Sequence, residues 1–430
     1  MPKTVSFVTL GCKVNQYDSQ AMLEAFEAKG YTVAEPGQGA DIYVVNTCTV
    51  TGTGDQKSRQ LVRRYRRKNP NAELVIAGCL AQRMGEGLRE TGARLVLGTQ
   101  YRGRVVELLE QAMAEGVQLV AVESLNSVPY EPLFIRNHEG HTRAVMKIQE
   151  GCDNHCTYCI IPSVRGGVRS RDLQSVRQEA EALAESGFQE IVLTGIHLSS
   201  YGRDLPEKPG LMDAVEAVCA AEGIKRVRLG SLEPRIVTPA FAAAAARQPK
   251  LCPQFHLALQ SGSDAVLRRM RRGYQTQHFG EAASRLRAVY PNAAFTTDVI
   301  VGFPGETEEE FAETLAFCQK VGFAKIHVFP FSSREGTPAA TMAGQVEKSA
   351  KDCRAHALMA LGETLAGAYR QGMLGQEREV LLEQRRPTGE WEGYTPEYVH
   401  TLVREGEAGK ILRVRLDTLT EEGMAGSLVE

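Results

Sequence analysis

The stretch that decides the fold is QEGCDNHCTYCIIPSVRGG, residues 149–167, in which Cys152, Cys156 and Cys159 stand close together. Cysteine thiolates bind zinc and iron–sulfur clusters, and both usually take four protein ligands. No fourth cysteine follows here. Catalytic metal sites keep an open coordination position, whereas structural sites close it. The spacing therefore favours a 4Fe–4S cluster with one open iron. A structural zinc site is the alternative, although His155 lies out of phase with the cysteines in so tight a loop.

The sequence around and beyond this loop alternates short apolar strands with helices, which predicts a parallel α/β sheet. The predicted strands are 143–149, 190–195, 226–231, 255–260, 295–302 and 325–331, and the helices between them include 173–186, 211–222, 276–289 and 307–320. Six units are fewer than the eight of a closed barrel. We therefore expect an open (β/α)6 partial barrel over residues 140–368.

The first 125 residues predict a separate Rossmann-like α/β domain with a parallel sheet. Its strands are 4–10, 42–47 and 73–78, and a helix over 17–30 has Gly30 as its C-cap. Each strand leads directly into a cysteine, namely Cys12, Cys48 and Cys79. Ligands of open parallel sheets bind outside the carboxyl ends of the strands. These thiols are therefore expected to converge on a second three-cysteine site.

Residues 123–134 carry two prolines and indicate a linker between the two domains. Residues 370–430 instead contain short strand-like runs with turns between them, which predicts a small antiparallel β-barrel. Residues 371–430 hold twelve acidic against seven basic side chains. This balance is unfavourable for binding nucleic acid unless the cations gather on one face.

Length and composition are those of a cytosolic protein with two or three domains. The 430 residues are 43 % hydrophobic and 24 % charged, without a run long enough for a membrane helix or a signal peptide. Ten cysteines without an export signal indicate metal ligands and buried thiols rather than disulfides. The four cysteines outside both trios are expected to pack in the core: Cys219, Cys252, Cys318 and Cys353.

Two dense positive clusters stand out, RRYRRK at 63–68 and RRMRRGY at 268–274. Charge runs usually form solvated faces. In the first cluster, however, an aromatic ring lies among the cations, which is typical of a surface that contacts phosphate and stacks on bases. The candidate RNA-binding residues are Arg63, Arg64, Tyr65, Arg66 and Arg67.

The cysteine run, with Tyr158 before its last member and six β/α units around it, resembles the radical S-adenosylmethionine (SAM) enzymes. The resemblance implies that the open iron is chelated by the amino and carboxylate groups of SAM. One electron from the cluster then cleaves SAM to a 5′-deoxyadenosyl radical. It also implies cofactor contacts at the strand ends, from Tyr158, Gly195, Glu233 and Gln260. A glutamate before proline is otherwise usually a cap or turn residue.

Three N-terminal motifs, LGCKVNQYDS (10–19), NTCTV (46–50) and AGCLAQR (77–83), resemble the methylthiotransferases, which bind a second 4Fe–4S cluster there. The resemblance covers essentially the whole chain, including a C-terminal barrel similar to the RNA-binding TRAM domain. It implies two 4Fe–4S clusters, SAM, the tRNA anticodon stem-loop as substrate, and a flavodoxin- or ferredoxin-like electron donor. The sequence indicates neither the sulfur source nor a further catalytic side chain.

Three loop motifs narrow the resemblance to one branch: LTGIHLSSYG (193–202), FHLALQSGSD (255–264) and VFPFSSREGTPAA (328–340). They are most similar to the enzymes that convert N6-threonylcarbamoyladenosine, beside the anticodon, to its 2-methylthio derivative. A sibling enzyme that acts on isopentenyladenosine in tRNA or on a ribosomal protein would share every cysteine. A zinc-dependent RNA-binding module is the alternative from another class.

Overall fold

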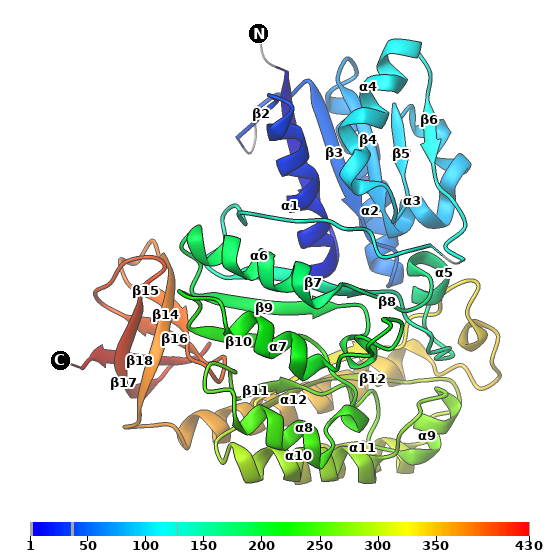
Figure 1. Ribbon diagram of the computed structural model, residues 1–430. Coiled ribbons are helices and arrows are strands. Elements are labelled where there is room, and N and C mark those ends of the chain that lie inside the picture. Colours follow the sequence, from blue (N-terminus) through cyan, green and yellow to red (C-terminus); the bar gives the residue numbers. More distant parts are fainter. Residues whose placement is uncertain (1–2, 36–37, 127, 430) are drawn as a thin grey trace.

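The computed structural model describes residues 3–35, 38–126 and 128–429. Ser127 in the predicted linker and Glu430 at the end of the last predicted strand lie outside the described residues. Figure 1 shows an N-terminal sheet domain above a curved β/α sheet, with a small β-barrel beside the latter at the C-terminus. None of the helices in the described ranges is long and apolar enough to cross a membrane.

The N-terminal sheet has six parallel strands in the order β2-β1-β3-β4-β5-β6. Helices cover both of its faces, so its central strands are almost fully buried and apolar. The strands are β1 (Thr4–Thr9), β2 (Thr32–Val33), β3 (Ile42–Thr47), β4 (Glu73–Gly78), β5 (Leu95–Leu97) and β6 (Leu119–Ala121). The parallel α/β fold predicted for this region is confirmed. The very short β2, β5 and β6 were not predicted, because two or three residues carry too little periodicity.

Two layers of helices sandwich this sheet. α1 (Lys13–Ala28) and α4 (Val105–Glu115) pack on one face, and α2 (Gly52–Lys68) and α3 (Cys79–Met84) pack on the other. α1 begins at Lys13, earlier than predicted, because Cys12 already serves as its N-cap. Its C-cap is Lys29 rather than Gly30, and Gly30 follows in the left-handed region at φ 82°.

The central domain is an open partial barrel of six parallel strands, as predicted. β8, a short antiparallel strand, lies at its edge, and isolated pairings at Val227–Leu251 and Leu232–Leu257 join the two hydrogen-bonded sheets. The strands are β7 (Ala144–Glu150), β8 (Arg169–Ser170), β9 (Glu190–Gly195), β10 (Arg226–Leu229), β11 (Gln254–His256), β12 (Ala294–Val301) and β13 (Lys325–Pro330). The helices are α5 (Ile161–Arg165), α6 (Leu173–Glu185), α7 (Leu211–Cys219), α8 (Pro239–Ala246), α9 (Asp264–Arg269), α10 (Thr276–Val289), α11 (Glu308–Val321) and α12 (Lys348–Gln371).

Alternation along the barrel strands separates a core face from an inner face. Phe255, Phe295 and Val299 belong to the main apolar cluster with the surrounding helices. Their neighbours on β11 and β12, such as His256 and Asp298, therefore point to the other side, the inner face of the barrel.

The cysteines outside both trios mostly follow expectation. Cys219, Cys252 and Cys318 are buried as predicted, whereas Cys353 is exposed. The prediction for Cys353 was wrong because α12 covers the barrel with one face only, through Ala355 and Leu358, and Cys353 lies on its other face.

The C-terminal domain is a closed barrel in the order β14-β15-β16-β18-β17. Its strands are β14 (Glu377–Arg385), β15 (Trp391–Tyr394), β16 (His400–Val403), β17 (Ile411–Leu419) and β18 (Met424–Leu428). The pairs are antiparallel as predicted, except that β16 and β18 run parallel. The barrel docks at the amino ends of the central strands, where Arg226 donates to the Tyr394 carbonyl at 3.0 Å and Arg143 bonds Glu383 at 2.6 Å.

Candidate functional site: two cysteine trios and the groups around them

The loop after β7 is shaped to gather its three thiols. Gly151 has φ +73°, and a Cβ there would lie 1.8 Å from the Gly167 carbonyl oxygen, so the turn requires glycine. Each sulfur accepts one hydrogen bond. The Asn154 N–H donates to Cys152 Sγ and the Ile161 N–H to Cys159 Sγ, both at 3.4 Å, and the Arg272 guanidinium donates to Cys156 Sγ at 3.0 Å. N–H donors of this kind tune thiolates that bind iron–sulfur clusters.

Burial and the neighbouring sulfurs of the loop both raise the pKa values of these thiols. Burial is the larger cause, and the pKa of Cys152 rises to about 12 and that of Cys159 to about 11. Such thiols release their protons when a metal cation binds, because the cation supplies the missing positive charge. Three converging thiols with N–H donors around them fit a cluster that has one iron without a protein ligand.

Glu233, at the carboxyl end of β10, is tied directly to this loop. Its carboxylate accepts from Asn154 at 3.0 Å and from Arg272 at 2.6 Å, and it lies 3.3 Å from His197 Nε2. Burial raises the pKa of Glu233, but the bonds from His197 and Arg272 outweigh burial and lower it. The site therefore holds a partly buried carboxylate anion beside the cysteine loop.

The other predicted cofactor contacts lie at the same edge of the barrel. A Cβ on Gly195 would lie 2.9 Å from Gln149, so a bare backbone is required there. Gln260 has φ 67° and accepts from the Ile300 N–H at 2.9 Å through its carbonyl. Tyr158 packs edge-on against Phe303, with ring centroids 6.5 Å apart. Their contacts with SAM stay predictions.

Arg272 is a site residue that the sequence did not reveal. It belongs to the positive cluster 268–274, but its side chain is only 8 % exposed and joins Cys156 to Glu233. Arg269 of the same run is paired with Glu310. The cluster is therefore not one surface patch. His197 and Asn154 were also missed, although both lie inside the motifs that were recognised.

The N-terminal trio gathers at the carboxyl edge of its sheet, as expected for cysteines that follow parallel strands. A Cβ on Gly11 would lie 3.0 Å from Cys48 Cβ, and one on Gly78 would lie 2.4 Å from Asn46 Oδ1, so both turns require glycine. Burial and, to a lesser degree, the sulfurs of Cys12 and Cys48 raise the pKa of Cys79 to about 11, although Arg165 opposes the shift. The three thiols thus lie near one another at this edge of the sheet.

Arg165 connects the two halves of the site. It ends α5, directly after the cysteine loop, and donates through Nε to Cys79 Sγ at 3.1 Å. Its Nη1 donates at 3.0 Å to both Asp18 and Glu150. Lys147 and Arg102 complete a buried network with the same two carboxylates. A network of buried ion pairs that spans the domain interface therefore fixes α5 against the N-terminal trio.

Replacing Arg165 by methionine should destabilise this interface by about 3–5 kcal/mol, because Asp18 and Glu150 lose a buried partner. The cations hold the pKa of both carboxyls below their usual range, although burial opposes this. Their contribution is therefore present above about pH 4 and is lost as the pH falls below it. Denaturant unfolding at pH 7 and at about pH 2 measures both effects. An unchanged midpoint at pH 7 would contradict the structural role.

A second clamp joins the N-terminal domain to the loop after β13. Arg334 donates to Thr49 at 2.8 Å and to Asp55 at 3.1 Å, and Arg83 pairs with both Asp55 and Glu335. Although burial opposes it, bonds from Arg59, Thr49 and Arg334 lower the pKa of Asp55 to about 2. This loop lies within the motif 328–340, which explains part of its polar character.

The predicted RNA-binding residues lie on α2. Arg63, Arg64 and Arg67 are exposed on this helix. Arg66 donates to the Ala72 carbonyl at 3.1 Å, and the Tyr65 ring packs on Tyr43 with centroids 5.0 Å apart. Tyr65 is thus engaged in the domain core, and the arginines are the groups left to face a partner.

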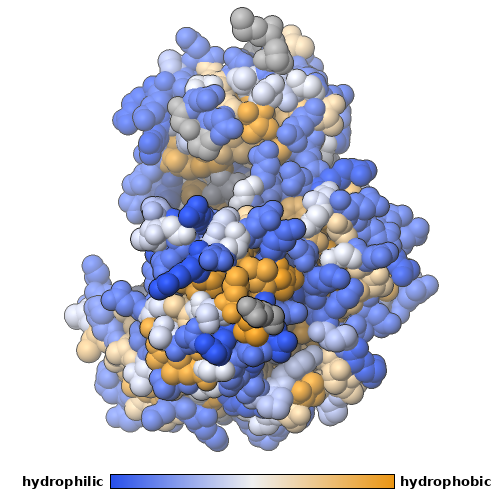
Figure 2. All heavy atoms as spheres, turned by 90° about the vertical axis from the view of Figure 1, so that its left-hand side faces the viewer, coloured by the Kyte–Doolittle hydropathy of each residue, from blue (hydrophilic) through white to orange (hydrophobic). Residues whose placement is uncertain are grey.

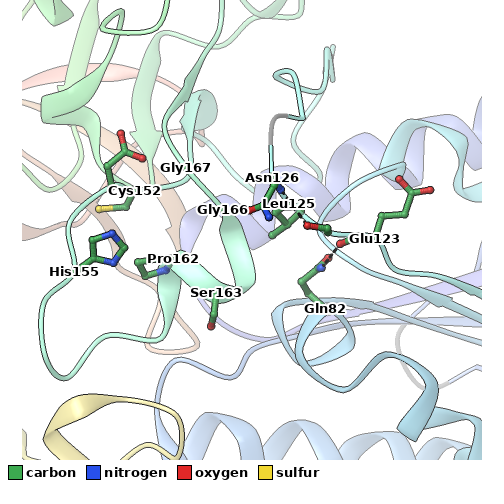
Figure 3. A pocket seen from close by; sticks show the side chains of 12 residues that line it. Gln82, Glu123, Leu125, Asn126, Cys152, His155, Pro162, Ser163, Gly166 and Gly167 are labelled. Atoms are coloured by element: carbon green, nitrogen blue, oxygen red, sulfur yellow. Dashed lines mark hydrogen bonds between the residues drawn. The ribbon is translucent and has the colours of Figure 1, made fainter.

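A cavity of about 360 Å³ lies beside the cysteine loop, between the N-terminal domain and the linker. Figure 3 shows Cys152, His155 and Ser163 on one side of it and Gln82 and Glu123 on the other. Glu233, Gly195 and Gln260 do not line it. The cavity is therefore separate from the strand-end group.

Three thiols on an open partial barrel define an iron–sulfur enzyme of the radical SAM class, and the comparisons agree. A radical SAM superfamily model matches residues 146–318, and a model of the uncharacterized protein family UPF0004 matches residues 4–98. Among solved structures, the radical SAM methyltransferase TsrM of Kitasatospora setae aligns over 79 % of this chain and 77 % of its own, with 15 % identity and a TM-score of 0.57. That likeness shows the shared fold.

Curated relatives identify the family more narrowly. The threonylcarbamoyladenosine tRNA methylthiotransferase MtaB of Bacillus subtilis is 41 % identical over 96 % of this chain and 93 % of its own. MtaB of Thermotoga maritima is 37 % identical over 98 % and 96 %. The tRNA-2-methylthio-N(6)-dimethylallyladenosine synthase of Parafrankia is 39 % identical over 87 % and 77 %. The chain belongs to the radical SAM methylthiotransferase family. It is an enzyme whose cofactors are 4Fe–4S clusters and SAM, which excludes the zinc-dependent binding module.

Proposed function

We propose that this enzyme converts N6-threonylcarbamoyladenosine in tRNA to its 2-methylthio derivative. The observation that carries the proposal is the near full-length similarity to two enzymes named for this substrate. The relative named for dimethylallyladenosine aligns over a smaller share of both chains. The same chain also carries both cysteine trios that the chemistry needs.

The residues fit the two clusters. Cys152, Cys156 and Cys159 would hold the cluster that binds SAM, and Cys12, Cys48 and Cys79 would hold the second one. When bound, the clusters and SAM supply a carbon radical that can remove hydrogen from an unactivated C–H bond, and SAM also supplies the methyl group. A place for them is indicated by the N–H donors on both trios and by the glycines that leave the turns bare.

The chain's own side chains position and shield this chemistry. Arg272 donates to Cys156 and to Glu233 and thereby connects the cysteine loop to the carboxyl end of β10. Glu233 is held ionised and offers an acceptor to an ammonium group, such as the amino group of SAM. Arg165, the last residue of α5, donates a hydrogen bond to Cys79 and so holds α5 against the N-terminal trio. Because Arg165 belongs to a buried network that spans the domain interface, we expect the two trios to keep a fixed separation while the substrate binds.

For tRNA binding, the exposed arginines of α2 are the better supported surface. The C-terminal barrel is expected to contact RNA as a TRAM-like domain, but many of its cations are already paired, as in Arg378–Glu397, Arg413–Glu377 and Arg415–Asp417. Figure 2, which faces this barrel, shows apolar side chains among the hydrophilic ones, and Leu419 and Leu428 are exposed large hydrophobics of its β17 and β18.

Replacing Arg63, Arg64 and Arg67 by serine should weaken binding of an anticodon stem-loop and flatten the salt dependence of this binding. Each phosphate contact that is lost lowers the number of counterions released when the RNA binds. Cleavage of SAM without substrate should persist, since these residues lie outside both trios. Titrating labelled RNA at two salt concentrations measures the slope. The exposed glutamates of α11, changed to glutamine at Glu308 and Glu309, serve as a control. Equal slopes for wild type and the serine variant would remove α2 from the binding surface.

The substrate assignment is tested by offering the reconstituted enzyme three substrates at equal concentration: stem-loops with threonylcarbamoyladenosine or isopentenyladenosine, and ribosomal protein. We expect methylthio incorporation into the first alone. Preferential modification of either other substrate would assign the enzyme to a sibling branch of the family instead.

An electron donor is also required, and we propose a flavodoxin- or ferredoxin-like protein in the cytosol, where tRNA is modified. The exposed Asp153 and His155 of the cysteine loop are the groups nearest to such a partner.

A further inference from the structure

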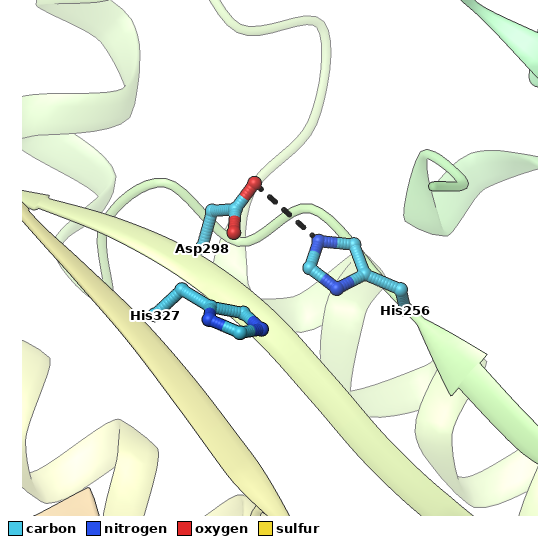
Figure 4. A group of neighbouring side chains, drawn as sticks. All are labelled: His256, Asp298 and His327. Carbon is cyan, nitrogen blue, oxygen red and sulfur yellow. Dashed lines mark ion pairs between the residues drawn. The ribbon is translucent and has the colours of Figure 1, made fainter. Parts of the chain in front are cut away.

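Three polar side chains meet on the inner face of the barrel, one from each of three neighbouring strands. His256 ends β11, Asp298 lies in β12, and His327 is the β-sheet partner of Asp298 in β13. Figure 4 shows the three side chains turned toward one another. His256 Nε2 lies 3.4 Å from the Asp298 carboxylate, and ligating atoms of all three lie within 4.8 Å of one another.

This inner-face group is open to solvent and has no role in the site described above. His327 is exposed, and the next inward residue of β13, Phe329, is 45 % exposed. His256 Nδ1 lies 3.0 Å from the Thr296 hydroxyl, which orients the ring. Gln260, a predicted SAM contact, lies four residues further along the chain, at the carboxyl end of the barrel. His256 is therefore deeper in the barrel than Gln260, whereas the Asp298 carbonyl accepts from the Gln260 N–H at 2.9 Å, so the group reaches up to the expected SAM position.

Lys13 adds a cation close to this group. It opens α1 directly after Cys12, and no hydrogen bond or ion pair forms on its ammonium among the described residues. Its side chain is exposed, its charge acts on His327, and the charges of Arg143 and Arg228 act on it in turn. The solvent-open space between Lys13 and the inner-face group is called the recess below. Arg143 and Arg228 are already bonded to Glu383 and Glu190, which leaves Lys13 as the cation ready for a new anion.

We propose that Lys13 and the group formed by His256, Asp298 and His327 receive the threonylcarbamoyl substituent of the substrate, with Lys13 pairing with its carboxylate. This inference rests on the proposed function and concerns how the enzyme selects that nucleoside. In adenine, C2 and N6 lie on the same edge of the ring. Whatever binds the N6 substituent must therefore lie beside the reacting carbon, between the two trios.

The chemistry of the group matches this substituent and not an apolar one. The substituent has a carboxylate, a hydroxyl and a urea-like linkage, which can pair with an ammonium, imidazoles and a carboxylate acceptor. A dimethylallyl group offers none of these partners and would leave Lys13 and Asp298 desolvated without compensation. The polar recess therefore selects for the charged nucleoside and against the apolar one.

Two histidines and a carboxylate are also a common donor set for a transition metal. The neighbouring Lys13 ammonium opposes this reading, because it would repel a divalent cation from the same recess. A retained stoichiometric metal that is lost in His327→Phe while both clusters stay loaded would overturn our inference.

Binding to the holoenzyme, with both clusters reconstituted, provides the test. Fluorescently labelled stem-loops carrying either threonylcarbamoyladenosine or plain adenosine are titrated against wild type and variants. Lys13→Met should lose on the order of tenfold in affinity for the modified stem-loop and little for the plain one, because a charge-assisted pair is removed. Lys13→Arg should restore most of the difference. His327→Phe should also reduce it, and Lys29→Met, at the far end of α1, should not.

The outcomes separate the two proposals. If wild type binds both stem-loops equally, the proposed substrate is wrong. A second outcome is that wild type prefers the modified stem-loop while Lys13→Met and His327→Phe keep the same preference. In that case Lys13 and the inner-face group do not recognise the substituent, and the inference fails. Iron content, measured on the same samples, shows that Cys12 still holds its cluster beside the altered residue, and SAM cleavage without substrate shows that the cysteine loop is unaffected.

Discussion

Cys156→Ala is expected to produce no 5′-deoxyadenosine from SAM under anaerobic, reducing conditions. Cys156 is buried and its sulfur accepts from Arg272, so it is the most enclosed thiol of the loop. Two remaining thiolates hold a four-iron cluster poorly, and the electron that cleaves SAM comes from that cluster. The same loss is expected for Cys152→Ala and Cys159→Ala. Liquid chromatography of the products after reconstitution measures it.

The control for this experiment is Cys353→Ala, which removes an exposed thiol of α12 that belongs to neither trio. It should cleave SAM at the wild-type rate. Undiminished 5′-deoxyadenosine from Cys156→Ala would contradict the assignment of the loop as the SAM-cleaving site.

The triple change of Cys12, Cys48 and Cys79 to alanine should lower the iron content to about half, because one of two equal clusters is lost. Cleavage of SAM should remain measurable while methylthiolated product disappears. The trio lies in a different domain from the cysteine loop, so its loss leaves the donors of Cys152, Cys156 and Cys159 in place. Iron analysis and product mass spectrometry on one preparation give both results.

Arg165 makes this second experiment informative about structure as well. Its bond to Cys79 is lost in the triple variant, but its bonds to Asp18 and Glu150 are not. The domain interface should therefore persist. A triple variant that retains all wild-type iron would show that the N-terminal trio is structural and that the two-cluster arrangement is wrong.

The local sequence pattern was sufficient to predict the strands that are marked by runs of apolar residues. Strands such as β3 and β9 lie where their apolar runs predict, because both are buried on two faces and carry a continuous signal. The two cysteine trios were also predictable, since each thiol follows a strand or stands in one short loop.

Contacts between distant segments were not predictable from one sequence. Arg165 meets Cys79 across 86 residues, and Arg272 meets Cys156 across 116. Nothing in the run RRMRRGY distinguishes a buried arginine from exposed ones, because burial there depends on how α9 packs behind the cysteine loop. The inner-face group was missed for the same reason. Its members come from three strands, and their proximity follows only when the register between these strands is known.

The most direct test of the central assignment is mass spectrometry of nucleosides from the tRNA of cells that lack this gene, compared with cells that carry it. We expect the 2-methylthio derivative of threonylcarbamoyladenosine to be absent without the gene and its unmodified precursor to accumulate. A wild-type copy should restore the product, whereas the Cys156→Ala copy should not. An undiminished level of the methylthio derivative in cells without the gene would contradict the assignment.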